Sequence, residues 1–275
     1  MKADLHVHSC YSNGFFHPKE LLSLATAQEI NHLAIVDHHT FAGIEAVKEA
    51  VKEVFFESPV NLIEGIEISA FDLKRQKHVR VLGYNLSNRS YIKQLCRPLL
   101  HFQTNQTLFK LKKLQAEGYH LKEEELWKEA EKATALYPCH LYRLLKKRGY
   151  GTQMDHTFYQ KLMTAEEVSD NRKKINVYDA IEAIKYGGGL TVLACPGKFD
   201  NYDLIPELAS FGIDGLEKYH PAHRIRDLKI LSDLIKTYHF SCFGGSDFHG
   251  IRGTTGFGRT LITDAREFPD QLLYN

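Results

Sequence analysis

The chain carries DLHVHSCYSNG at residues 4–14, a short apolar run that is followed by turn-forming residues. The run predicts a β-strand over 3–7 that ends before the Ser-Asn-Gly turn at 12–14. Because side chains alternate along a strand, His6 and His8 point to the same side of it. Two imidazoles on one face form a typical pair of ligands for a divalent metal ion.

Strand-like and helix-like segments alternate through most of the chain. Further strands are predicted over 32–36, 60–69, 79–84, 190–194, 213–217 and 240–244, with helices over 18–30, 40–56, 177–186, 202–211 and 226–238. Seven strands that alternate with helices favour an α/β fold with a parallel sheet that closes, or nearly closes, into a barrel.

Residues 97–175 interrupt this alternation, since their apolar spacing is helical and no strong strand pattern occurs among them. We therefore expect a barrel formed by 1–96 and 176–275, with 97–175 as a small helical insertion. The insertion is rich in basic residues, with clusters at 110–113, 146–148 and 172–174. Two interpretations stay open: these are solvated helix faces, or they form a local surface that collects anions.

The composition excludes several classes of protein. The 275 residues include 35 Lys and Arg against 34 Asp and Glu, a net charge of +1 that argues against an extended surface for duplex nucleic acid. No run approaches the roughly 18 to 20 apolar residues that cross a bilayer, and the N-terminus has no apolar signal-peptide segment, so we expect no membrane partner. Five scattered cysteines indicate reduced thiols in a cytoplasmic protein.

The 15 histidines are the unusual feature of the composition, and several of them follow predicted strands. Barrel folds place their chemistry at the carboxyl ends of strands. Six strand ends or their continuations carry potential metal ligands, which are His6 and His8, His38 and His39, Glu67, Cys195, Glu217 with His220 and His223, and Asp247 with His249. This distribution predicts a metal site.

Four of these segments, DLHVHSCYSNG, AIVDHHT, GIEIS and GGSDFHG, closely resemble the motifs of the PHP (polymerase and histidinol phosphatase) family. The resemblance covers essentially the whole chain. The segments PCHLYRLL and GIDGLEKYHPAH look like the bacterial subgroup that acts on nucleotides and short RNA 5′ ends. The resemblance implies a distorted (β/α)7 barrel that binds two to three divalent ions (Mn, Fe or Zn) and hydrolyses phosphate esters.

The resemblance also implies three metal sites. The first would use His6, His8, Glu67 and Asp247, the second would share Glu67 and add His78 and Cys195, and the third would use His38, His249 and Asn13. Asp4 and Asp37 are expected to accept hydrogen bonds that orient the imidazoles.

The chain departs from the family pattern at three positions. Asn13 replaces the usual Asp, and an amide oxygen is the poorer ligand. Cys195 replaces the usual His, and it is either a thiolate ligand that favours zinc or iron, or a buried apolar thiol. Pro138 stands where the subgroup has Arg before His140, and Arg143, one helical turn on, is placed to substitute for it.

The implied activity is hydrolysis of a nucleotide, such as a nucleoside bisphosphate, or of a short nucleic-acid 5′ end by a metal-activated water. His220 or His223 would protonate the leaving group or bind a phosphate oxygen, unless they are ordinary surface histidines. His140 and Arg143 are predicted to contact the phosphate. Two alternatives remain, namely a phosphatase of a small metabolite such as histidinol phosphate, and a catalytically degenerate PHP-fold binding protein. The oligomeric state is left open.

Overall fold

The computed structural model describes residues 1–275 except 54–59, 154–157, 159–161, 163–173, 251–255 and 274–275. Its first three strands are β1 (Ala3–Val7), β2 (His32–Ile35) and β3 (Asn61–Asp72), and they pair in parallel. The helices α1 (Pro18–Ala27) and α2 (Ala42–Glu53) connect these strands, as the apolar spacing predicts.

The fourth strand, β4 (Lys77–Tyr84), corrects the expectation of a parallel sheet. It is antiparallel both to β3 and to β6 (Leu190–Ala194). Only residues 73–76 join β3 to β4, and a parallel pair needs a crossover connection of a dozen residues or more. The two strands therefore form a hairpin.

The remaining strands restore the parallel arrangement. β7 (Gly215–Tyr219) and β8 (Ser241–Gly244) follow β6, while the short β5 (Ile175–Asn176) pairs with β3. The helices of this half are α7 (Val177–Tyr186), α8 (Pro196–Phe199), α9 (Ile205–Phe211) and α10 (Ile225–Tyr238). Short 3-10 helices are η1 (Tyr150–Gln153), η3 (Tyr202–Leu204), η4 (Ala265–Glu267) and η5 (Asp270–Leu272).

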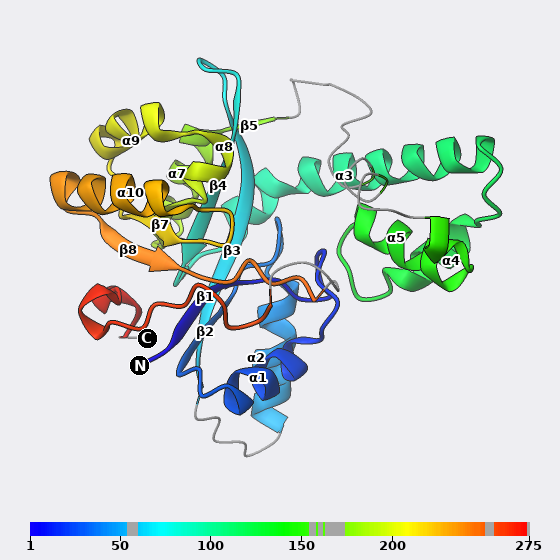
Figure 1. Ribbon diagram of the computed structural model, residues 1–275, viewed down its shortest axis with the longest axis horizontal. Coiled ribbons are helices and arrows are strands. Elements are labelled where there is room, and N and C mark those ends of the chain that lie inside the picture. The colour runs from blue at the N-terminus through cyan, green and yellow to red at the C-terminus, as the bar shows by residue number, and fades with distance from the viewer. Residues whose placement is uncertain (54–59, 154–157, 159–161, 163–173, 251–255, 274–275) are drawn as a thin grey trace.

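The seven strands form a nearly closed barrel in the order β1-β2-β3-β4-β6-β7-β8, which confirms the predicted fold class (Figure 1). A bridge between Val7 and Phe248 brings the end of β1 beside the segment after β8. Inside the barrel, the buried side chains of Leu5, Ile63 and Phe243 belong to one apolar cluster. Fully burying each such side chain contributes about 1.5–3 kcal/mol.

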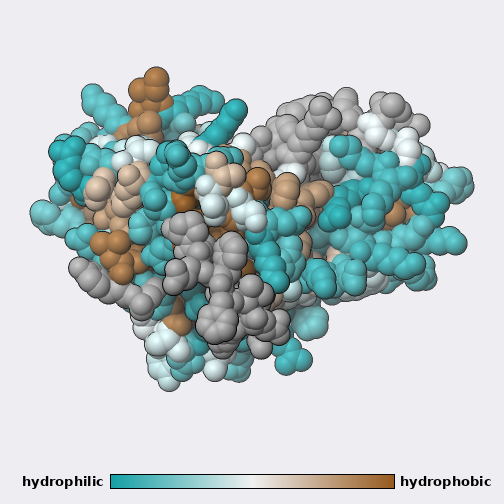
Figure 2. All heavy atoms as spheres, turned by 90° about the horizontal axis from the view of Figure 1, so that it is seen from below, coloured by the Kyte–Doolittle hydropathy of each residue, from teal (hydrophilic) through white to brown (hydrophobic). Residues whose placement is uncertain are grey.

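The described residues between β4 and β5 are largely helical, and most of them form a lobe that projects from the barrel (Figure 1). It contains α3 (Ser90–Ala116), α4 (Glu123–Glu129) and α5 (Pro138–Lys147), and it has an apolar core of its own. The lobe coincides broadly with the predicted insertion at 97–175, although α3 already begins at Ser90; the division into domains stays a prediction. Hydrophilic residues cover most of the lobe face seen in Figure 2, as is usual for helices that contact solvent.

Within the described ranges, every helix is either too short or too polar to serve as a membrane-spanning segment.

Candidate metal centre

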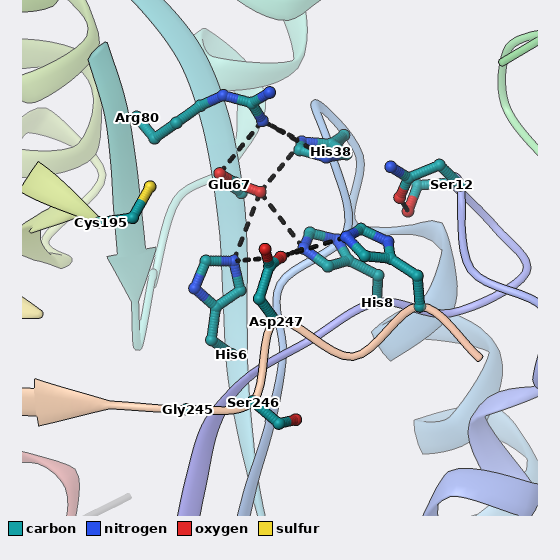
Figure 3. A network of polar contacts seen from close by, with 12 residues as sticks. His6, His8, Ser12, His38, Glu67, Arg80, Cys195, Gly245, Ser246 and Asp247 are labelled. Atoms are coloured by element: carbon teal, nitrogen blue, oxygen red, sulfur yellow. Dashed lines mark hydrogen bonds and ion pairs between the residues drawn. The ribbon is translucent and has the colours of Figure 1, made fainter. Parts of the chain in front are cut away.

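Four side chains predicted for the first metal site converge at one end of the barrel (Figure 3). His6 lies on β1, His8 directly follows that strand, Glu67 lies on β3, and Asp247 lies three residues after β8. Glu67 Oε2 lies 3.5 Å from His6 Nε2 and 3.3 Å from His8 Nε2, while Asp247 Oδ1 lies 3.6 and 3.5 Å from the same nitrogens. The expected alternation along β1 thus places both imidazoles against the same carboxylates.

These facing atoms fit a metal ion. His6 Nε2, His8 Nε2 and Glu67 Oε2 are buried and, within the described residues, form no hydrogen bond of good geometry. Buried polar atoms without partners are costly, and imidazole nitrogens with carboxylate oxygens are the ligands that zinc, iron and manganese take in proteins. A divalent ion bound among them would satisfy all three atoms.

Three further groups of potential ligands surround this one, and the ligand atoms of each group lie within 4.8 Å of one another. They are His6 with His220 and Asp247, His8 with Asp247 and His249, and Cys195 with Glu217 and His220. The buried clusters are therefore consistent with more than one metal site.

The residues predicted for the third site lie around the same centre. His38 Nδ1 is 3.1 Å from Glu67 Oε2. The His249 ring is stacked on His8 at 4.2 Å between centroids, and its Nε2 is 3.1 Å from Asp247 Oδ1. Asn13 lines the adjoining cavity, with its Oδ1 3.3 Å from the hydroxyl oxygen of Ser12.

The residues predicted for the second site are separated. Cys195 is buried and belongs to the group with Glu217 and His220. His78 lies at the exposed end of β4, where its ring contacts Phe71 and Phe199, and it joins none of the ligand groups found among the described residues.

Arg80, which the sequence motifs do not indicate, occupies the position on β4 that faces the centre. Its Nη1 lies 3.1 Å from Glu67 Oε1 and 3.1 Å from His38 Nδ1. Burial disfavours the charged guanidinium, but Glu67 opposes this effect and the pKa of Arg80 is raised. Lys198 is a second overlooked cation, with its Nζ 3.6 Å from Asp247 Oδ2. Searching for metal-ligating residue types could not find either side chain.

Backbone geometry around the centre is unusual. Asp247, Cys195 and His39 have φ angles of 48°, 37° and 61°, in the left-handed region that residues other than glycine rarely adopt. Such strain clusters at functional sites, because the surrounding structure must maintain it.

Glu217 orients the first imidazole. It is fully buried, and its Oε1 accepts a 2.7 Å hydrogen bond from His6 Nδ1 while its Oε2 accepts one of 2.7 Å from the Cys195 backbone N–H. Burial would raise the pKa of Glu217, but the neighbouring His6 and His220 together with the hydrogen bonds from His6 and the Cys195 N–H lower that pKa. The bond to Nδ1 leaves Nε2 of His6 directed at the centre.

Asp4 and Asp37 do not orient imidazoles as expected, and the structure corrects this point. Asp4 accepts hydrogen bonds from the backbone N–H and the hydroxyl of Ser246, at 2.8 and 2.6 Å. Asp37 accepts from Ser9 N–H at 2.7 Å and from Ser12 Oγ at 2.6 Å. These carboxylates instead hold the loops that carry Asp247 and Asn13.

The two histidines predicted to act in catalysis have different surroundings. His220 is buried with its Nε2 3.3 Å from Asp247 Oδ2, and it belongs to two of the ligand groups. Both ring nitrogens of His223 contact backbone groups, with Nε2 accepting from Gly197 N–H and Nδ1 lying 2.8 Å from the Lys218 carbonyl.

The residues predicted to contact phosphate lie in the helical lobe. His140 is buried and its Nδ1 accepts a hydrogen bond from Tyr137 N–H at the start of α5. Arg143 Nε is 3.2 Å from Glu129 Oε2, and its guanidinium lies over the Phe15 ring. Neither is among the described residues that line the cavity beside the centre.

That cavity has a volume of about 480 Å³ and extends from the centre to α3 of the lobe. Its basic residues are Arg80, Lys110, Lys174 and Lys198, and its aromatic residues include Phe71, Phe102 and Phe199. Lys110 and Lys174 come from two of the basic clusters in the sequence; Arg172 and Lys173 lie outside the described residues. The cavity can therefore attract an anion while offering ring faces to an apolar group.

Residues 4–180 match the PHP domain family. The chain is 32% identical over 255 residues to a phosphoribosyl 1,2-cyclic phosphate 1,2-diphosphodiesterase of Eggerthella lenta, covering 92% of this chain and 96% of that protein. It is 28% identical over 270 residues to a 5′-3′ exoribonuclease of Haemophilus influenzae, covering 94% of each. A crystal structure from Bifidobacterium adolescentis shares the fold, with a TM-score of 0.81, 22% identity and coverage of 95% of this chain and 92% of that one. The chain therefore belongs to the PHP family and is a metal-dependent phosphoesterase.

Proposed function

We propose that the protein hydrolyses phosphate esters of ribose compounds, namely a nucleotide such as a nucleoside bisphosphate or the 5′ end of a short RNA. The observation that carries this proposal is the convergence of buried, unpartnered atoms of His6, His8 and Glu67 at the end of a cationic cavity. Cationic side chains beside a metal-binding site stabilise the negative charge of a phosphate ester and of its transition state.

We assign different roles to the side chains of the centre. His6, His8, Glu67 and Asp247 would hold a Mn, Fe or Zn ion, while Glu217 fixes the orientation of His6. The bound ion would polarise the phosphoryl oxygens and lower the pKa of a water molecule toward neutrality. Lys198 and Arg80 place positive charge beside the carboxylates, where it offsets the charge of the phosphoryl group.

His220 is the group best placed to transfer a proton to the leaving oxygen, since its Nε2 is buried and, within the described part of the chain, forms no hydrogen bond. The alternative for His220 is ligation of a metal together with Asp247 and His6. His223 is less suited to proton transfer because both of its ring nitrogens already contact the backbone.

The shape of the cavity supports a nucleotide rather than extended nucleic acid. Its volume of about 480 Å³ falls within the range of roughly 300–1,000 Å³ that holds a small ligand. Phe71 and Phe199 line it, with Arg80 and Lys198 lying 6.0 and 5.7 Å from the centroid of the Phe199 ring, and aromatic rings stack on nucleobases of any sequence. A phosphate at the metal centre would leave the base near these rings.

A phosphoribosyl cyclic phosphate is the second candidate substrate. The similarity to the Eggerthella lenta diphosphodiesterase, 32% identity over nearly the full length of both proteins, favours it. Both candidates present a phosphate ester on ribose, so one metal centre can act on either.

A substrate panel tests the proposal. The metal-loaded protein is assayed for release of phosphate or product from a nucleoside 3′,5′-bisphosphate, a 5′-phosphorylated short RNA, phosphoribosyl 1,2-cyclic phosphate and histidinol phosphate. We expect the highest kcat/KM on one of the three ribose compounds and a loss of about 100-fold or more in His8→Ala. Preference for histidinol phosphate would favour a metabolite phosphatase, and no turnover of any compound would indicate a binding protein.

A further inference from the structure

The carboxylate of Glu67 faces two different environments with its two oxygens. Oε2 lies among His6, His8 and His38, at 3.5, 3.3 and 3.1 Å from their nitrogens. Oε1 faces Arg80, whose Nη1 is 3.1 Å away (Figure 3). A carboxylate that bridges two metal ions divides its oxygens in the same manner, so the guanidinium stands where a second ion would stand.

The contacts of Arg80 support the view that its guanidinium replaces a metal ion beside Glu67. Its Nη1 is also 3.1 Å from His38 Nδ1, so one NH2 group of the guanidinium donates to two potential metal ligands. A guanidinium has five N–H donors and no lone pair, hence it satisfies these acceptors without itself ligating a metal. Since its charge also repels a divalent ion at short range, guanidinium and ion exclude each other here.

The other residues that could hold an ion on this side are poorly placed. His78 lies two positions before Arg80 on β4, at the exposed start of the strand, and packs against Phe71 and Phe199. The thiol of Cys195 belongs to the group with Glu217 and His220, and that group contains neither Glu67 nor His38. Among the described residues, Arg80 is thus the cation that pairs with Glu67 Oε1.

The guanidinium is also accessible from the cavity. Its side chain is 27% exposed and lines the cavity together with Lys198, while all of its hydrogen bonds to described residues run through Nη1. Nη2 and Nε are consequently available as donors. Arginine donors in this fork geometry match two oxygens of a phosphoryl group.

We propose that Arg80 is a built-in cation that takes the place of one divalent ion beside Glu67 Oε1 and binds a phosphoryl oxygen of the substrate from the cavity side. The second half of this proposal rests on the proposed function, whereas the first half concerns metal binding alone. Arg80 is then both a substitute for a metal ion and a substrate-binding residue.

Metal content tests the first half. Wild type, Arg80→His, Arg80→Lys and Arg89→His are stripped, reloaded with Mn²⁺, desalted and measured by elemental analysis. Arg89 is the matched control, because it also pairs with a buried carboxylate, Glu64, which belongs to none of the ligand groups among the described residues. Arg80→His should gain about one ion per chain, since an imidazole supplies a lone pair and releases Glu67 Oε1. Arg80→Lys and Arg89→His should keep the wild-type content.

An unchanged or lower content in Arg80→His, with the far-UV circular dichroism of wild type, would overturn the first half. A gain in Arg80→Lys would also overturn it, because lysine keeps the positive charge. Should Arg80→His not fold, Arg80→Ala replaces it with the same expected gain, since alanine also frees Glu67 Oε1 and His38 Nδ1.

Binding of inorganic phosphate, measured by calorimetry on the loaded proteins, tests the second half. Arg80→Lys is the variant to compare, because it should keep the wild-type metal content, and it should bind phosphate about tenfold more weakly than wild type since lysine lacks the fork of donors. Binding within twofold of wild type in Arg80→Lys would contradict contact of the guanidinium with the phosphoryl group. The measurement of metal content does not depend on turnover. The first half of the proposal can therefore be refuted while hydrolysis is normal, or supported while no substrate of the panel is hydrolysed.

Discussion

At the scale of single residues, Glu217 shows how a side chain outside the metal cluster can control it. Its carboxylate holds His6 Nδ1 at 2.7 Å, so that Nε2 points to the centre. Glu217→Gln keeps the volume but removes the charge that favours this orientation. We expect about 10–100-fold weaker metal affinity or activity, measured by titrating the stripped protein with Mn²⁺.

The matched control for this substitution is Glu207→Gln, which removes a half-buried carboxylate that pairs with Arg75 and lies outside the ligand groups found among the described residues. Its metal affinity should equal that of wild type. Equal affinity in Glu217→Gln would show instead that the hydrogen bond to His6 does not contribute to metal binding.

The residues of the centre differ in how far the sequence could predict them. His6 and His8 are predictable because alternation along one strand suffices to place them on one face. Which of His78 and Arg80 faces Glu67 depends on the register of β4 against β3, and the sequence does not give this register. In the structure, Ser69 pairs with Arg80 and Phe71 pairs with His78. A search for metal-binding residue types selects the histidine and passes over the arginine that faces Glu67.

At the scale of elements, the first turn of α5 depends on a buried histidine. His140 Nδ1 accepts the Tyr137 N–H, and burial lowers the pKa of His140 to about 4. The unfolded chain, with a histidine pKa near 6.5, therefore binds more protons than the folded one between these values. The contribution to stability is complete above about pH 6.5 and is lost as the pH falls toward 4.

This difference in pKa predicts that wild type loses about 2 kcal/mol more stability between pH 7.5 and pH 5 than His140→Gln does. Glutamine can accept the same N–H bond without titrating, as in a capping box. Urea unfolding at the two pH values measures the difference. Identical pH dependence in the two proteins would contradict a neutral, buried His140.

The helical lobe has a separate core that can be weakened without touching the metal centre. Leu126 is fully buried in that core, while the neighbouring Trp127 is 42% exposed. Leu126→Ala should destabilise the lobe by about 2–5 kcal/mol, and Trp127→Ala by much less. Hydrogen exchange in α4 and α5 measures the loss. Metal content is expected to be that of wild type, and a fall in it would contradict this independence.

Helices and strands are predictable where the apolar spacing within one segment determines them. The direction of a strand is not, because it depends on how two segments pair. The apolar runs predict the seven strands of the barrel but not their direction, and the expected parallel arrangement is wrong for β4. The four residues at 73–76 were the available indication that β4 turns back on β3, because no helix fits into so short a connection.

At the scale of the whole molecule, the unpartnered atoms of the centre link metal binding to stability. Since an ion binds the folded chain and satisfies buried nitrogens and oxygens, it should raise the free energy of unfolding by about 2.7 kcal/mol at 100 times its Kd. Thermal unfolding of the stripped protein with increasing Mn²⁺ or Zn²⁺ measures this effect. The increase should be absent in His8→Ala, and an equal increase there would place the ion elsewhere.

The central claim is that a metal ion bound by His6, His8, Glu67 and Asp247 is required for hydrolysis of a phosphate ester. The most direct measurement is turnover of the best ribose phosphate from the panel by chelator-stripped protein, before and after reloading with Mn²⁺ or Zn²⁺. We predict loss of activity on stripping, recovery on reloading in wild type, and no recovery in Asp247→Ala. Full activity in stripped protein that elemental analysis finds free of metal would contradict the claim.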